Sequence, residues 1–114
     1  MRTRLILSGL YLSALVGCTS MGPPPNEIPA AIATASTAAD HQRIADYFSQ
    51  KAADYEAEAA NHEKLSRLYR DSPRAMPGAM ASHCRALRDQ FQTAAREARA
   101  LAEEHRQFAA RTGK

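Results

Sequence analysis

Cys84 carries a thiol, which can bind metals or form disulfides, and other residue types that bind metals lie next to it in the sequence. His83 directly precedes Cys84, and Met80 lies one helical turn before it. A thiolate and a thioether are soft ligands that favour Cu(I), and imidazole suits copper, zinc or iron. Together with His62, these residues predict a metal site with copper as the first choice, and Met76 is an additional candidate ligand.

The four histidines of the chain fall into two pairs, and the two members of each pair are nearly equally far in sequence from residues 72–73. His62 and His83 lie at nearly equal distances from residues 72–73, and so do His41 and His105. In an antiparallel helical hairpin that turns at this point, the members of each pair lie at one level. His62 and His83, the pair closer to the turn, belong to the predicted copper site. The far pair, His41 and His105, predicts a second and weaker metal site.

Three interpretations of Cys84 stay open: a metal ligand, a small buried apolar side chain, or half of a disulfide between two chains. A histidine on the apolar face of a helix is most often a hydrogen-bonded core residue. Catalysis has little support, because His83 and Cys84 diverge by about 100° around a helix. No orienting carboxylate or oxyanion site accompanies them. We therefore expect no enzymatic activity.

Two long segments consist mainly of residue types that favour helix, and neither contains proline or glycine. They cover about 38–70 and about 79–111. Thr37 followed by Asp40 approximates a capping box at the start of the first segment, and Pro73 disfavours helix in the residue before it. A connector this short makes the helices antiparallel neighbours. The sequence thus predicts an all-α, antiparallel two-helix hairpin spanning residues 37–112.

Both segments carry apolar side chains at heptad spacing, which predicts a stripe on each helix that faces the other. In the first segment, one row consists of His41, Phe48, Tyr55, His62 and Tyr69, and the next row is mostly alanine. In the second segment, the predicted central row consists of Met80, Leu87, Ala94, Leu101 and Phe108. It is flanked by a second row of Cys84, Phe91, Ala98 and His105.

A single hairpin buries little apolar area, because each stripe has only one partner. We therefore expect self-association, most simply a dimer of hairpins that forms a four-helix bundle. Docking onto another helical protein is the alternative.

The first 18 residues have the order of a secretory signal. Arg2 and Arg4 precede an apolar run at 5–16, which is too short for an ordinary membrane span. The run ends in Leu15-Val16-Gly17-Cys18, which resembles the lipobox of bacterial lipoproteins. That resemblance implies a cleaved signal peptide at 1–17 and a Cys18 that carries diacylglycerol and an acylated amino terminus. Because no aspartate follows Cys18, similarity to Gram-negative lipoproteins implies sorting to the outer membrane, with the protein facing the periplasm.

Residues 18–36 are expected to form a tether behind the lipid. The segment contains Pro23, Pro24, Pro25 and Pro29. Prolines at this density favour an extended, polyproline-like spacer.

The net charge and the number of cysteines bear on nucleic-acid binding and on disulfide formation. The chain has 15 basic and 12 acidic residues. Cleavage of the signal peptide removes Arg2 and Arg4, which leaves 13 basic and 12 acidic residues and a net charge of +1. No basic stripe with interleaved aromatics remains, so nucleic-acid binding is not expected. With Cys18 acylated, Cys84 has no partner for a disulfide within the chain.

The hairpin segment carries two short motifs, M-x-x-H-C at Met80–Cys84 and Glu104-His105-Arg106. They resemble those of small exported helical proteins of proteobacteria that are generally described as uncharacterised. This resemblance implies no established activity. The expected function is that of a lipid-anchored structural or interaction lipoprotein of the cell envelope. The alternative is a small copper-binding protein.

Overall fold

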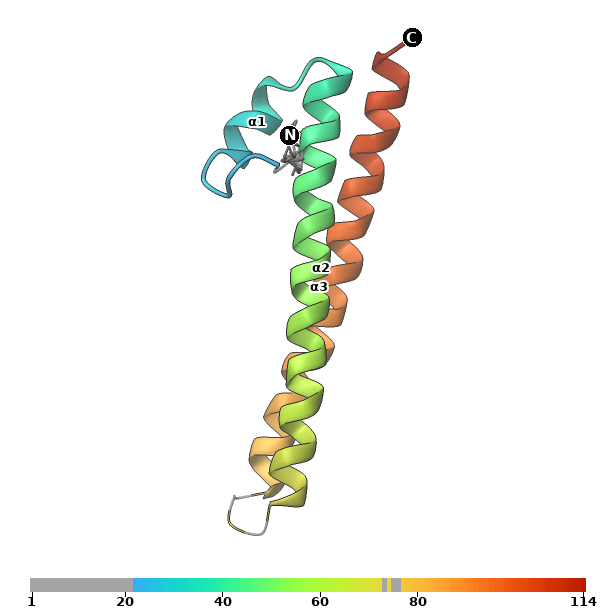
Figure 1. The fold of residues 1–114 in the computed structure, drawn as a ribbon. Coiled ribbons are helices and arrows are strands. Elements are labelled where there is room, and N and C mark those ends of the chain that lie inside the picture. The colour runs from blue at the N-terminus through green and yellow to red at the C-terminus, as the bar shows by residue number, and fades with distance from the viewer. Residues whose placement is uncertain (1–21, 73, 75–76) are drawn as a thin grey trace, which may run out of the picture.

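Two long antiparallel helices form the body of the protein (Figure 1). The computed structural model describes residues 22–72, 74 and 77–114, and these contain three helices and no strand. They are α1 (Ile28–Thr34), α2 (Ala38–Asp71) and α3 (Pro77–Thr112). α2 and α3 lie side by side from the connector to the open end, where α2 begins and the chain ends. The predicted all-α hairpin is confirmed, with helix ends within two residues of the predicted ones.

A capping box fixes the start of α2. The Thr37 hydroxyl accepts a hydrogen bond from the Asp40 amide at 3.1 Å, and the Asp40 carboxylate accepts one from the Thr37 amide at 3.0 Å. The side-chain bond with Thr37, followed by backbone bonds from Ser36 and Thr37, lowers the pKa of Asp40. These contacts satisfy amides that have no partner within the helix. The helix start predicted from Thr37 and Asp40 is therefore confirmed.

α2 and α3 meet along a line of small buried side chains, which we call the alanine seam. On α2 it consists of Ala45, Ala52, Ala59 and Ser66. On α3 it consists of Ala81, Cys84, Ala95, Ala98 and Ala102. The distance between packed helices depends on the side chains at the contact, and alanine permits a close approach. Rings of the two helices pack beside the alanine seam, among them Tyr55 on Phe91 with centroids 6.2 Å apart.

The row of α3 that was predicted to be central lies at the edge of the contact with α2 instead, so that part of the sequence prediction is wrong. Its large members are 42, 38, 41 and 46% exposed, in the order Met80, Leu87, Leu101 and Phe108. Ala94 is half-buried. Ala81, Ala95 and Ala102, which follow Met80, Ala94 and Leu101 by one position, are buried against α2 instead. We call the row Met80, Leu87, Ala94, Leu101 and Phe108 the α3 apolar row.

The other edge of the hairpin is ionic. Polar side chains bridge the helices there in three places: Glu63 with Arg88, Glu56 with Arg99, and Ser49 with Arg106. Side chains two residues apart on a helix point in nearly opposite directions, about 200° apart. Arg99 and Arg106 therefore lie across α3 from Leu101 and Phe108. The hairpin has one ionic edge and one apolar edge.

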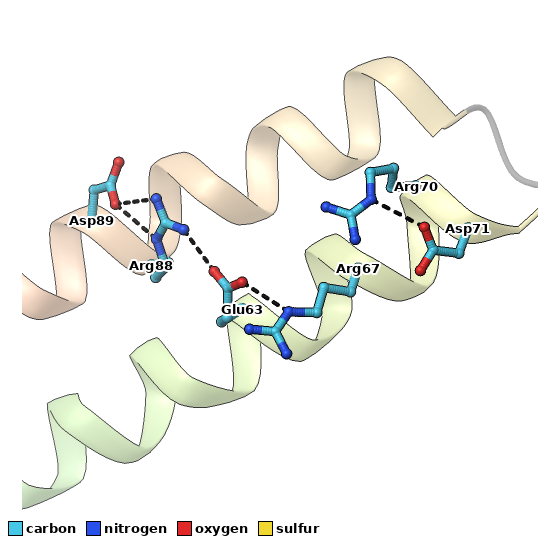
Figure 2. Close-up of polar contacts among 6 residues, drawn as sticks. All are labelled: Glu63, Arg67, Arg70, Asp71, Arg88 and Asp89. Atoms are coloured by element: carbon cyan, nitrogen blue, oxygen red, sulfur yellow. Dashed lines mark hydrogen bonds and ion pairs between the residues drawn. The ribbon is translucent and has the colours of Figure 1, made fainter.

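Glu63 is the centre of the ionic contacts near the connector (Figure 2). Its carboxylate accepts hydrogen bonds from Arg88 of α3 at 2.6 Å and from Arg67 of its own helix at 3.0 Å. Arg88 also pairs with Asp89 at 2.7 Å. The hydrogen bond from Arg88, followed by that from Arg67, lowers the pKa of Glu63 below its ordinary value of 4.5.

This lowered pKa predicts an acid dependence of stability. The unfolded chain binds the Glu63 proton more readily than the folded chain, so the contribution is complete above about pH 5 and is lost as the pH falls through 4.5 and below. Glu63→Gln should therefore melt below the wild type at neutral pH, and the difference should shrink as the pH falls below about 4.5. Thermal melts followed by circular dichroism at a series of pH values measure this. Glu58→Gln, at an exposed position of α2, is the control, and a gap between Glu63→Gln and wild type that stays constant with pH contradicts the prediction.

The second half of the predicted tether is not extended. Residues 28–34 form α1, with Pro29 in its first turn, where a missing amide hydrogen costs nothing. Ile28 and Pro23 are buried. Gly22 lies against the α2 backbone so closely that a Cβ there would come within 2.8 Å of the Tyr47 nitrogen. The prediction of an extended spacer is thus wrong for 28–34, because apolar residues of this segment pack against α2.

Some predicted features lie outside the described residues. The lipobox, Cys18 and Met76 are among them. In the described part of the chain, no helix combines the length and the hydropathy needed to cross a membrane.

Candidate functional site

The two histidines of the open end face each other across the hairpin. His41 of α2 and His105 of α3 bring their Nδ1 atoms to 3.1 Å. At this distance one ring donates an N–H and the other accepts it, so at least one imidazole carries a free lone pair. The prediction that this pair lies at one level is confirmed, because both residues are about equally far from the connector along helices of equal rise.

Aromatic rings surround the histidine pair. The His41 ring stacks on Phe108 with centroids 5.3 Å apart, and the His105 ring stacks on Phe48 at 6.1 Å. Burial lowers the pKa of His105, the neighbouring His41 lowers it further, and Glu104 opposes the shift. The surroundings favour the neutral imidazole and with it the N–H···N bond. While this bond holds, the neutral pair offers one free ring nitrogen, and its metal role stays a prediction.

His62 does not join His83. Its ring stacks on Phe91 with centroids 5.5 Å apart and planes 13° apart. Its Nδ1 is buried and has no hydrogen-bond partner in the structure. Phe91 lies about two helical turns beyond His83 on α3. The ring of His62 therefore packs further from the connector than His83 lies.

The predicted copper ligands divide between the interior and the surface. Cys84 is a free thiol buried in the alanine seam, whereas His83 and Met80 are exposed. Within 22–72, 74 and 77–114, no group of three or more His, Cys, Asp or Glu side chains is arranged to hold a metal ion. The copper site of His62, His83, Cys84 and Met80 therefore stays a prediction. The position of Cys84 matches the interpretation of a small buried apolar residue.

The surface that sequence reasoning missed is the α3 apolar row. On one side of it a groove runs between the helices, lined in part by Tyr47, Phe48, Ala94 and Leu101. On its other side lies a shallow hollow lined by Asp89, Gln90, Thr93 and Ala94. The row thus stands as a ridge of large side chains that dips at Ala94. The pattern that reveals it in the sequence is the heptad spacing of Ala81, Ala95 and Ala102, which competes with the larger row for the inward position.

This arrangement suits binding more than chemistry. Large side chains at heptad spacing, beside grooves, are what an approaching helix packs against. No family model matches the chain, and no curated protein or solved structure is significantly similar to it.

Proposed function

We propose that this protein is a lipid-anchored interaction module of the cell envelope and that the α3 apolar row is its docking surface. The observation that carries the proposal is the exposure of Met80, Leu87, Leu101 and Phe108 along one line of a single helix. Contiguous exposed apolar side chains on a folded protein mark sites of interaction, whereas isolated ones do not.

The shape of the row indicates what kind of partner it fits. From Met80 to Phe108 the row runs for about 42 Å, at 1.5 Å per residue. Heptad spacing over this length is the pattern that a second long helix meets with its own knobs and holes. A partner helix aligned with α3 would cover all the large members at once, and a small ligand would cover only one or two.

The lipobox and the packing of residues 22–34 together support a location close to the membrane. Gly22 is held against Tyr47 near the open end of α2. The four peptide units between Cys18 and Gly22 reach about 14 Å at full extension. A lipid on Cys18 would therefore keep the open end of the hairpin near the bilayer surface.

The test uses the full-length chain expressed in a Gram-negative envelope. A photo-crosslinking amino acid in place of Leu101 should yield discrete protein adducts in the membrane fraction. The same residue in place of Glu103, which is exposed on the opposite side of α3, is the matched control. Wild type should incorporate a labelled fatty acid, and Cys18→Ala should abolish this incorporation.

Two outcomes would overturn the proposal. Equal adduct formation from positions 101 and 103, or none from either, would show that the apolar row is not a docking surface. Incorporation of the labelled fatty acid into the Cys18→Ala chain at the wild-type level would show that the anchor is not a lipid on Cys18.

A further inference from the structure

We infer that His41 and His105 together bind a divalent transition-metal ion of the class that prefers imidazole, and that this ion joins α2 to α3 at the open end of the hairpin. The ligand atoms are the two Nδ1 atoms, which lie 3.1 Å apart across the helices. Imidazole suits zinc and copper among other ions, and Zn²⁺ is the probe chosen below. The inference is independent of the proposed docking function, because the ion lies between the two helices of one hairpin.

The spacing of the two ring nitrogens suits one shared ion. Bonds between zinc and a histidine nitrogen are about 2.0–2.1 Å long, so two such nitrogens lie about 2.9 Å apart at a right angle and about 3.3 Å apart at the tetrahedral angle. The distance of 3.1 Å between the Nδ1 atoms of His41 and His105 falls between these two values. Only small movements of the rings are therefore needed to bring both nitrogens onto one ion.

The ion takes the place of the N–H···N bond between the two rings. The ring that donates this bond changes to its other neutral tautomer, with the proton on Nε2, and both Nδ1 lone pairs are then free for the metal. Each imidazole remains neutral and keeps one N–H, so no proton has to leave the pair. Burial, followed by the neighbouring His41, lowers the pKa of His105, which favours the neutral form that a metal ligand needs.

Aromatic stacking holds both imidazoles in place before an ion binds. The His41 ring stacks on Phe108 with centroids 5.3 Å apart, and the His105 ring stacks on Phe48 at 6.1 Å. Side chains that are already ordered lose little conformational entropy on binding. The two histidines are also 64 residues apart in the chain, and a metal that closes a long loop removes more entropy from the unfolded chain than one that closes a short loop.

The protein supplies two ligands to this site, and the other coordination positions stay open. Within 22–72, 74 and 77–114, no third His, Cys, Asp or Glu side chain joins the pair in a group arranged to hold a metal. Both histidines are only half-buried, so water can reach the ion and fill these positions. Structural zinc sites are closed by four protein ligands, whereas sites with fewer protein ligands keep an open position. We therefore expect reversible binding that stabilises the open end.

Thermal melts of the full-length chain, made without a histidine tag, test this inference. All variants carry Cys84→Ser, so that the thiol cannot bind the ion. Zn²⁺ well above its Kd should raise the melting temperature of this parent by about 5 °C or more. Mg²⁺, which prefers oxygen ligands, should have no effect. His105→Gln should abolish the shift, and His83→Gln, at an exposed position of the same helix, should retain it.

Isothermal titration of the same chains gives the stoichiometry. The parent and His83→Gln should each bind one Zn²⁺ per chain, and His41→Gln and His105→Gln should bind none. An unchanged melting temperature of the parent in Zn²⁺ would overturn the inference. A full shift in His105→Gln, or loss of the shift in His83→Gln, would overturn it as well, because the ion would then be held elsewhere. Adduct formation from position 101 does not depend on any of these results, so the docking surface is tested separately.

Discussion

Ala52→Leu is expected to lower the melting temperature of the hairpin by roughly 5–20 °C. Ala52 is buried in the alanine seam, where the packing of α2 against α3 depends on small side chains. Forcing extra methylene groups into a packed contact costs about 1–3 kcal/mol, and each kcal/mol shifts the midpoint by about 4–8 °C in a domain of this size. A leucine there pushes the two helices apart along several turns. Thermal melts followed by circular dichroism at fixed protein concentration measure the loss.

Ala53→Leu is the matched control for this prediction. Ala53 is the next residue of α2 and is exposed, so the same substitution falls on the same helix but outside the contact. Surface substitutions change stability by no more than about 0.5 kcal/mol in most cases. Equal melting temperatures for Ala52→Leu and Ala53→Leu would mean that the alanines do not form the contact between the helices.

Ile44→Ala is expected to cost about 2–5 kcal/mol, the range for removing a fully buried isoleucine side chain to its Cβ. Ile44 is only 1% exposed and is the largest side chain buried this deeply in the described residues. Its equivalents one and two heptads later, Lys51 and Glu58, are half-buried and exposed. Ile44 lies in the part of α2 on which residues 22–34 pack, and this packing accounts for its deeper burial. Loss of this side chain should therefore also loosen α1.

Limited proteolysis together with thermal melts measures both effects. Ile44→Ala should melt earlier than wild type and be cut more rapidly within residues 22–37. Ile32→Ala is the control, because Ile32 lies on α1 and is 46% exposed. If Ile32→Ala were as damaging as Ile44→Ala, the buried contact of α1 would have to lie on a different face of that helix.

The histidines show how far residue counting along a hairpin can predict a site. His41 and His105 were expected at one level from their distances to the connector, and their Nδ1 atoms lie 3.1 Å apart. His62 and His83 satisfy the same count, yet the ring of His62 stacks on Phe91 instead. Level depends only on the rise per residue, which every helix shares. Contact also depends on the direction in which each side chain leaves its helix, and His83 points outward.

The sequence by itself determined that this protein is a hairpin. Helix-favouring composition, the Thr37 and Asp40 capping box and the breakers near Pro73 are local features, and local features specify where helices start and stop. The sequence also specified two adjacent apolar rows on α3, but its periodicity did not say which of them faces inward. Only the tertiary structure decided that rotation, because the choice depends on the volumes of the α2 side chains that α3 meets. The small side chains of the alanine seam took the buried position, and the larger row beginning at Met80 was left at the partly exposed edge of the contact.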